Sequence, residues 1–297
     1  MTVKAPTLCR LSRRALLVAL AFALRPIGLA RTSAAETVAP GTRPLHVLFI
    51  GNSYTSVNSL PSIFEQMTVS AGLPKPVVAS VTPGGWQLMK HLQSPDTLAK
   101  MDGGAGDGAR WDVVVLQEQS QTPAMAETAD NLRKTFLDGV TGLYDRIKAK
   151  NPNARVVLYE TWARHADLWK TSAKDAQSLG RSPADMHARL RKWYGNAAKE
   201  IAQRSKAIRK TDVLIARVGD FWELHYQSTN PIRLHRTDGS HPEFIGSYLA
   251  GIVMFATIFD TSPQKVTWHG NLPEADAAAM KSFVASHPEL LPQRTGR

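Results

Sequence analysis

The segment His46-Val-Leu-Phe-Ile-Gly-Asn-Ser-Tyr-Thr55 decides the fold of this chain. Its first five residues form an almost uninterrupted apolar run, which is typical of a strand buried on both faces. Gly51 ends the run, and Asn52 and Ser53 are residue types that often cap the start of a helix. Apolar residues then recur at helical spacing from position 60 to position 71. The segment therefore predicts a strand at 46–50 that turns directly into a helical region.

The alternation of strand and helix continues along the chain. Apolar runs predict strands at 76–81, 112–116, 155–159 and 213–216. Helices are predicted at 126–150, 182–210, 242–259 and 274–286, and residues 86–101 are expected to be helical in part. Residues 223–240 are expected to form a long loop. Apolar strands that alternate with helices favour a parallel sheet covered on both faces. We therefore predict an α/β fold, with one domain at 44–270 and a helical tail at 271–297.

Residues 1–35 have the pattern of an export signal peptide, and residues 36–43 form a polar linker. A basic start precedes a ten-residue apolar core, which is too short to span a bilayer. Small residues at 33–35 offer a cleavage site, so we expect a periplasmic or secreted protein with no stable membrane span. The arginine pair Arg13-Arg14 partly resembles a twin-arginine signal, and ordinary secretion is equally compatible. Loss of this segment would lower the formal charge from +11 to about +5.

Composition excludes several function classes. The chain has one cysteine, Cys9, which lies in the predicted signal, so neither a disulfide framework nor a cysteine zinc site is expected. Basic residues are scattered along predicted helices, which is weak evidence for nucleic-acid binding. The sequence has no HExxH, no GxSxG, no phosphate-binding loop and no strand-linked GxGxxG. We therefore expect no metal, no cofactor and no nucleic-acid partner, while the oligomeric state stays open.

Three polar residues in two distant segments point to nucleophilic catalysis. Ser53 follows the first strand, and the carboxyl ends of parallel strands are where such sheets bind ligands. A serine needs a base to become a nucleophile, and His241 follows a long connection that can return to the same edge. Asp238, three residues earlier, can accept the other imidazole N–H and fix the tautomer. The sequence predicts these three as catalytic residues.

An anionic transition state also needs hydrogen-bond donors. The backbone N–H of Ser53 and that of Gly84 or Gly85, after the second strand, are predicted donors because glycine lets a substrate approach the backbone. A side-chain amide after the third strand can supply another donor. Gln117 and Gln119 both qualify, and the sequence does not choose between them.

These motifs resemble those of the SGNH (GDSL-like) hydrolase superfamily over residues 45–260. Gly51-Asn52-Ser53 is similar to its first block, usually GDS, and Gly84 or Gly85 to the glycine of its second block. Asp238-Gly-Ser-His241 matches the terminal DxxH block, whereas Gln117-Glu-Gln-Ser120 departs from the usual GxND, with Gln119 at the asparagine position. A GNS first block with a QEQS third block resembles a bacterial branch of the superfamily. The resemblance implies a flavodoxin-like three-layer sandwich with a five-stranded parallel sheet, a Ser-His-Asp triad, no metal, and ester hydrolysis.

The predicted export of the protein and the aromatic residues near strand ends favour an acylated, often acetylated, glycan as substrate. Asn52, Tyr54, Trp86, Glu118 and Trp162 are predicted substrate-binding residues, although Asn52 also suits a turn and aromatic residues also suit a core. Two other enzymes stay open: an acyltransferase using the same site, and a glycosidase that pairs Glu118 with Glu160. A lipase fits less well, since the sequence offers only the polar loop 171–182 as a lid. A non-catalytic carbohydrate-binding protein on the same scaffold is the alternative outside enzymes.

Overall fold

The structure is a computed structural model that describes residues 2, 42–106, 108–204 and 213–292. The predicted signal peptide, its Cys9 and most of the linker lie outside the described residues.

Five parallel strands form one sheet: β1 (His46–Ile50), β2 (Val77–Val81), β3 (Val113–Leu116), β4 (Arg155–Tyr159) and β5 (Val213–Ala216). Their order across the sheet is β2-β1-β3-β4-β5, and each neighbouring pair is parallel. This is the flavodoxin-like order, in which the chain reverses its direction of winding between β1 and β3. The predicted α/β fold and its five strands are confirmed.

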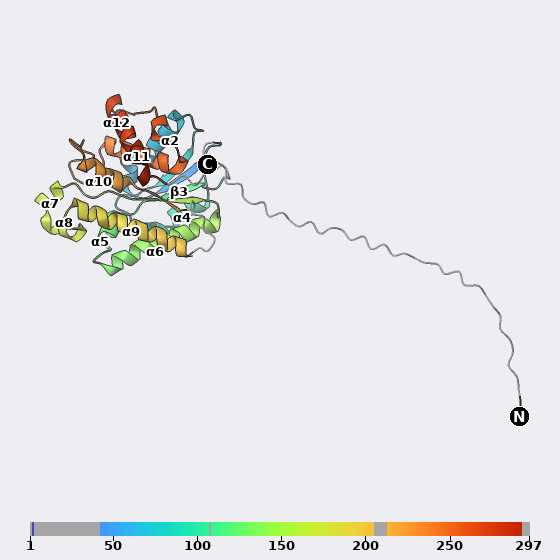
Figure 1. Ribbon diagram of the computed structural model, residues 1–297. Coiled ribbons are helices and arrows are strands. Elements are labelled where there is room, and N and C mark those ends of the chain that lie inside the picture. Colours follow the sequence, from blue (N-terminus) through green and yellow to red (C-terminus); the bar gives the residue numbers. More distant parts are fainter. Residues whose placement is uncertain (1, 3–41, 107, 205–212, 293–297) are drawn as a thin grey trace. The chain divides into compact units, whose positions relative to one another are not determined.

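Helices cover both faces of the sheet (Figure 1). The structure forms α1 (Ser53–Ser56), η1 (Val57–Ser59), α2 (Leu60–Ser70), α3 (Leu88–Gln93), α4 (Pro95–Asp102), α5 (Gln121–Met125), α6 (Asp130–Lys150), α7 (Asp167–Thr171), α8 (Ala173–Leu179), α9 (Pro183–Arg204), α10 (Val218–Gln227), α11 (Phe244–Phe259), η2 (Pro263–Lys265), α12 (Glu274–Ala285) and η3 (Pro288–Leu290). The three-layer arrangement predicted from the resemblance is confirmed.

Alternate side chains of the strands enter two separate cores, because successive residues of a strand point to opposite faces. Val47, Phe49, Val113, Val115 and Val157 pack with helices α2, α10, α11 and α12 on one face. Leu48, Ile50, Val114, Leu116 and Leu158 pack with α3, α6 and α9 on the other face. Strands buried on both faces explain why their sequences are continuously apolar.

Two expectations about connections need correction. The predicted loop at 223–240 begins inside α10, whose apolar residues lie at helical spacing and are buried. The loop expected at 171–182 contains all of α8. The region 86–101, expected to be helical in part, forms two helices, because Ser94 caps α4 and Pro95 starts it. The helical tail joins the first core through Ala277, Met280 and Val284.

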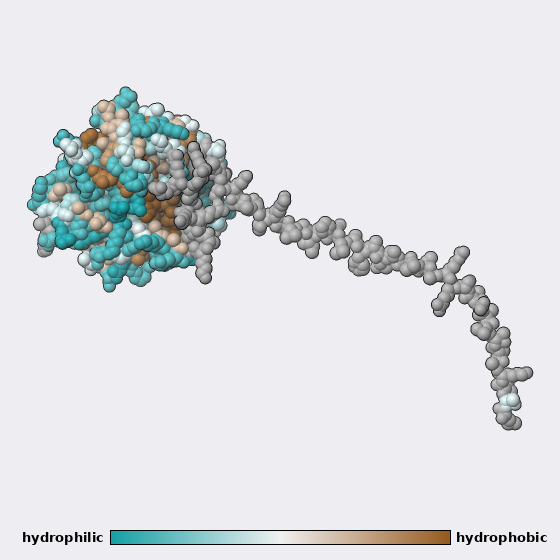
Figure 2. Space-filling view, in the orientation of Figure 1, coloured by the Kyte–Doolittle hydropathy of each residue, from teal (hydrophilic) through white to brown (hydrophobic). Residues whose placement is uncertain are grey.

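The surface seen in Figure 2 is largely hydrophilic, with smaller hydrophobic areas. In the described part of the chain, the exposed large hydrophobic side chains are Val69, Val77 and Ile232, each between 38% and 45% exposed. No described helix combines the length and apolarity needed to cross a membrane.

Candidate active site

Ser53 occupies the first position of α1, directly beyond the carboxyl end of β1. Asn52 is the N-cap: its Oδ1 accepts a hydrogen bond from the Tyr54 N–H at 3.1 Å. Gly51 precedes it where space is lacking, since a Cβ there would lie 2.6 Å from Gln117 Oε1. A glycine, a capping amide and a serine thus form a turn that leaves the Ser53 side chain only partly buried.

Ser53, His241 and Asp238 form a continuous hydrogen-bonded chain. Ser53 Oγ lies 2.9 Å from His241 Nε2, although 188 residues separate them. His241 Nδ1 lies 2.7 Å from Asp238 Oδ2, so a proton on Nδ1 is donated to the carboxylate and leaves Nε2 free to accept from the serine. The side chain of His241 is 33% exposed and that of Asp238 is 47% exposed. The geometry is that of a serine beside an oriented general base, at a solvent-accessible position.

The loop that carries Asp238 and His241 is built around the aspartate. Asp238 Oδ1 accepts from the backbone N–H groups of Ser240 and His241, at 2.8 and 2.9 Å. Gly239 takes a left-handed conformation with φ of 65°, which suits glycine and closes the turn. Burial by itself would raise the pKa of Asp238, but these two N–H groups and His241 hold it below its ordinary value. Asp238 is therefore ionised while it orients the imidazole.

A stack of buried aromatic rings supports this loop. Tyr54 stacks on Trp162 with ring centroids 4.4 Å apart, and Trp162 stacks on Trp222 at 4.0 Å. The indole N–H of Trp162 donates to the carbonyl of Ser240 at 3.0 Å, and Tyr54 Oη lies 3.0 Å from Ser240 Oγ. The stack therefore connects the residue after Ser53 to the residue before His241.

The predicted substrate-binding residues are divided by this packing. Trp162 is fully buried, Tyr54 is 4% exposed, and Asn52 and Glu118 are buried as well. Trp86 is only partly buried and contacts His91, with ring centroids 5.1 Å apart. Of the predicted set, Trp86 is the residue that is not buried.

Backbone donors lie at two predicted positions. As the first residue of α1, Ser53 has no acceptor for its N–H within the helix. Pro83, Gly84, Gly85 and Trp86 form a turn closed by a 3.3 Å hydrogen bond from the Trp86 N–H to the Pro83 carbonyl. Space is open around both glycines, and Asn52 Nδ2 ties this turn to the serine turn through the Trp86 carbonyl at 2.9 Å.

The two glutamines after β3 make different contacts. Gln117 is fully buried, and its Nε2 donates to Asn52 Oδ1 at 3.0 Å and to the Glu118 carbonyl at 2.6 Å. Both amide hydrogens of Gln117 are thus used inside the protein. Gln119 is partly exposed, and its Nε2 donates to Gln121 Oε1 at 2.9 Å, which leaves one hydrogen without an acceptor among the described residues. This difference favours Gln119 as a donor to a ligand.

Glu118 is enclosed beneath the same segment. Its carboxylate accepts from the backbone N–H groups of Gln119 at 2.7 Å and Leu88 at 3.2 Å. Burial raises the pKa of Glu118 to about 8, although these donors act in the opposite direction. Its contacts connect the third strand to α3, which is a structural role.

We expect Glu118 to make stability depend on pH. Its folded-state pKa lies above its unfolded value, so the stability that protonation contributes is complete below about pH 4.5 and is lost as pH rises to about 8, at up to ~1.4 kcal/mol per pH unit. Chemical denaturation of Glu118→Gln should show a smaller decline over that range than the parent. Parallel pH profiles for the two proteins would contradict the assignment.

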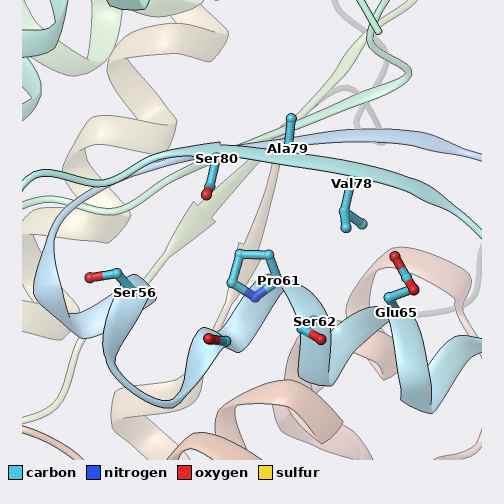
Figure 3. A pocket seen from close by; sticks show the side chains of 8 residues that line it. Ser56, Pro61, Ser62, Glu65, Val78, Ala79 and Ser80 are labelled. Atoms are coloured by element: carbon cyan, nitrogen blue, oxygen red, sulfur yellow. The ribbon is translucent and has the colours of Figure 1, made fainter.

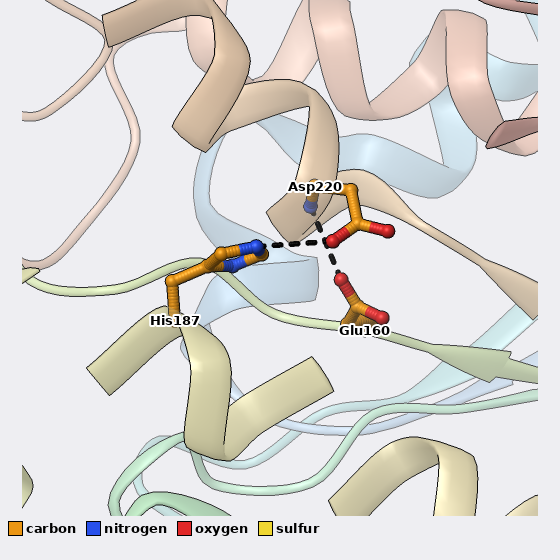
Figure 4. A group of neighbouring side chains, drawn as sticks. All are labelled: Glu160, His187 and Asp220. Atoms are coloured by element: carbon orange, nitrogen blue, oxygen red, sulfur yellow. Dashed lines mark hydrogen bonds and ion pairs between the residues drawn. The ribbon is translucent and has the colours of Figure 1, made fainter. Parts of the chain in front are cut away.

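Glu160 is not placed as a catalytic partner of Glu118 but belongs to a separate buried group with His187 and Asp220 (Figure 4). Asp220 Oδ1 lies 3.0 Å from His187 Nε2, and the Asp220 N–H donates to Glu160 Oε1 at 3.1 Å. Arg217 lies 3.3 Å from Asp220 and 3.6 Å from Glu160, and Arg191 lies 3.5 Å from Asp220. Because two arginines already lie at ion-pair distance from these carboxylates, we assign the group as an ion-pair network.

A separate pocket lies between the edge strand β2 and helix α2, and its lining includes no residue of the triad (Figure 3). Its lining is mainly small and polar: Ser56, Ser59, Pro61, Ser62, Glu65, Val78, Ala79 and Ser80. None of these residues contacts Asp238 or His241 among the described interactions, and the pocket carries no chemistry that the triad uses.

Comparisons with known proteins agree with the fold. No protein-family model matches the chain, and no curated protein matches it. A crystal structure of a DUF4886 family protein from Bacteroides uniformis matches with a TM-score of 0.65 and 17% identity, covering 85% of this chain and 97% of that one. A protein from Slackia heliotrinireducens described as a "putative SGNH hydrolase" matches with a TM-score of 0.52 and 27% identity, covering 72% of this chain and 99% of that one. The chain therefore has the fold of an SGNH hydrolase.

Sequence reasoning missed two residues that lie beside this candidate site. His91 is fully buried; its Nε2 lies 2.8 Å from the Gly51 carbonyl, and burial lowers its pKa, so it supports the serine turn as a neutral imidazole. Arg164, four residues after Glu160 in the segment beyond β4, lies over the Tyr54 ring with its guanidinium carbon 5.4 Å from the ring centroid. Neither residue belongs to a sequence motif. The available sequence signals are that Arg164 follows a predicted strand and that His91 lies in a region expected to be helical in part.

Proposed function

We propose that this protein is an exported serine esterase whose triad is Ser53, His241 and Asp238. The observation that carries the proposal is the pair of short contacts, 2.9 Å from Ser53 Oγ to His241 Nε2 and 2.7 Å from His241 Nδ1 to Asp238 Oδ2. The SGNH fold supports hydrolysis of an ester bond as the reaction class. The chemistry then follows from the positions of the protons.

In the proposed first step, Ser53 Oγ attacks the ester carbonyl carbon while His241 Nε2 takes the serine proton. Asp238 holds the imidazolium that forms. The tetrahedral intermediate expels the alcohol, which leaves with the proton from His241, and an acyl-serine ester remains. Water then attacks this ester with His241 again as the base, and Ser53 is regenerated with release of the carboxylic acid.

Negative charge on the carbonyl oxygen needs donors that are already in place. The proposed donors are the backbone N–H groups of Ser53 and of Gly84 or Gly85, together with the amide of Gln119. Gln119 is chosen over Gln117 because it has an amide hydrogen that no described residue accepts.

Gln119→Ala is expected to lower kcat by about 100- to 1,000-fold, the usual effect of losing one oxyanion donor. Gln121→Ala is the matched control, because it removes the current acceptor of Gln119 and leaves the proposed donor in place. Both are measured with p-nitrophenyl acetate at saturating concentration. Full activity of Gln119→Ala would contradict this assignment and return the role to Gln117.

The proposed natural substrate is an acyl ester, such as an acetyl ester, on a carbohydrate outside the cytoplasm. Export and the partly exposed ring of Trp86 support this class, while the buried Tyr54 and Trp162 do not add to it. Few exposed large hydrophobic residues in the described part argue against a lipase surface. An acyltransferase would use the same triad with a sugar hydroxyl in place of water.

The proposal is tested by incubating the protein of residues 36–297 with p-nitrophenyl acetate and acetylated glycans, with and without an acceptor sugar. Release of free acetate is expected for the esterase. Acetylated acceptor without free acetate would identify the acyltransferase. Glycan binding that persists in a parent protein without turnover would identify the non-catalytic alternative.

A further inference from the structure

Arg164 is a cation beside the proposed triad that no carboxylate pairs. Its Nη1 donates to Ser120 Oγ at 2.9 Å, and no carboxylate of the described residues lies within 4 Å of its guanidinium. Its backbone N–H contacts Met186 Sδ at 3.4 Å, which fixes the start of the side chain. A guanidinium has five N–H donors, so four are left without an acceptor in the described part of the chain.

The surroundings of Arg164 come from three parts of the site. Tyr54 follows the nucleophile, Ser120 ends the QEQS segment after β3, and Asp238 is the nearby negative charge that acts on Arg164. Burial lowers the pKa of Arg164 to about 10, with the charge of Asp238 acting in the opposite direction, so the group stays protonated at neutral pH. The Asp238 oxygens are already taken by His241 and two backbone N–H groups.

Burying a charged guanidinium raises the free energy of the folded state unless an opposite charge or hydrogen-bond acceptors compensate it. Other arginines of the chain show the usual solutions. Arg217 contacts Asp220, Arg233 contacts Asp167, and Arg155, which also lacks a carboxylate, donates to the Ile258 carbonyl at the opposite end of β4. Arg164 is different because its charge is partly buried, accessible to a ligand and beside the reacting groups.

We propose that Arg164 binds an anionic group of the substrate, so that the preferred ester carries a carboxylate or a similar oxyanion near the scissile bond. The planar guanidinium suits such a group because it can donate two parallel hydrogen bonds. The anion can belong to the acyl part or to the alcohol part of the ester. This inference rests on the proposed esterase site, and it narrows the substrate class to anionic esters.

The test compares three acyl esters: neutral p-nitrophenyl acetate, mono-p-nitrophenyl succinate with the anion on the acyl side, and 4-acetoxybenzoate with the anion on the alcohol side. The parent is expected to prefer one anionic ester. Arg164→Gln should lower kcat/KM for that ester by about 10- to 100-fold, mainly through KM, and change the neutral ester less than ~3-fold. Arg164→Lys should restore part of the loss.

Arg133→Gln is the matched control, since Arg133 also lies over an aromatic ring, Trp193 at 5.7 Å, but on helix α6. It should leave all three rates unchanged. Equal losses on neutral and anionic esters in Arg164→Gln, or a parent that prefers the neutral ester, would overturn the proposal and leave Arg164 a positioning residue.

Binding separates this proposal from the esterase proposal, because it requires no turnover. Calorimetry with each of the two anionic esters on Ser53→Ala should show binding of at least one that falls about 10-fold or more in the Ser53→Ala, Arg164→Gln double variant. Binding with this dependence, in a parent that hydrolyses nothing, supports anion recognition and refutes the esterase. Absence of binding of both esters to Ser53→Ala refutes anion recognition whatever the activity.

Discussion

Ser53→Ala is expected to lower the hydrolysis of p-nitrophenyl acetate by about 10,000-fold or more, to the level of residual binding and oxyanion effects. The variant removes the atom that attacks the carbonyl and leaves the rest of the site intact. Its free energy of unfolding should change by less than ~1 kcal/mol, since the side chain is small, partly exposed and not the helix cap.

Ser56→Ala is the control for this variant. Ser56 lies on the same short helix, is exposed, lines the pocket beside α2, and makes no described contact with His241. It should keep parental activity. His241→Ala should fall as far as Ser53→Ala, and the double variant should fall no further, because residues that act as one unit are not additive. Retained turnover in Ser53→Ala would overturn the serine mechanism.

Much of this site was predictable because the fold places chemistry at strand ends. The apolar run at 46–50 ends in a buried strand, so the polar residues that follow had to lie at the carboxyl edge of the sheet. Asp238 and His241 are three residues apart, and one turn around Gly239 is enough to bring them together. The local sequence therefore predicted the two segments of the triad, Ser53 and Asp238 with His241. The alternation of strands and helices predicted that these two segments lie at the same edge of the sheet.

Other features depend on packing that no local pattern encodes. Tyr54, Trp162 and Trp222 follow strand ends as sugar-binding aromatic residues do, yet they stack on each other in the core. Gln117 and Gln119 are the same residue type two positions apart, and only their hydrogen-bond partners distinguish them. Arg164 belongs to no motif, and its meaning comes from the absence of a paired carboxylate within the described residues.

The helix α10 shows a second limit. Its sequence, Val218-Gly-Asp-Phe-Trp-Glu-Leu-His-Tyr-Gln227, has polar residues among the apolar ones and no capping side chain at Arg217. Tertiary contacts decide the matter: Phe221 and Trp222 are buried in the first core, and Asp220 joins Glu160 and His187. Although its apolar residues lie at helical spacing, the segment lacks a capping signal at its start, and long-range burial is what stabilises the helix.

Asp238→Asn is expected to lower kcat by roughly 1,000- to 10,000-fold while leaving the structure intact. The substitution changes which nitrogen of His241 carries the proton, but it does not change the shape of the side chain. Asparagine retains an oxygen that accepts from the Ser240 and His241 N–H groups, so the turn persists. Its amide nitrogen then faces His241 Nδ1 and donates to it, which moves the imidazole proton to Nε2. In that tautomer Nε2 no longer accepts the serine proton.

The chain offers a matched control for this tautomer effect. Asp167 lies 2.9 Å from His165 Nδ1, a second aspartate–histidine pair that does not include the proposed triad. Asp167→Asn should change kcat less than ~3-fold. The proton position can be read from the 15N chemical shifts of the His241 ring, which should indicate Nδ1–H in the parent and Nε2–H in Asp238→Asn. An unchanged tautomer with unchanged kcat would remove Asp238 from the triad and leave the orientation of His241 to other groups of its loop.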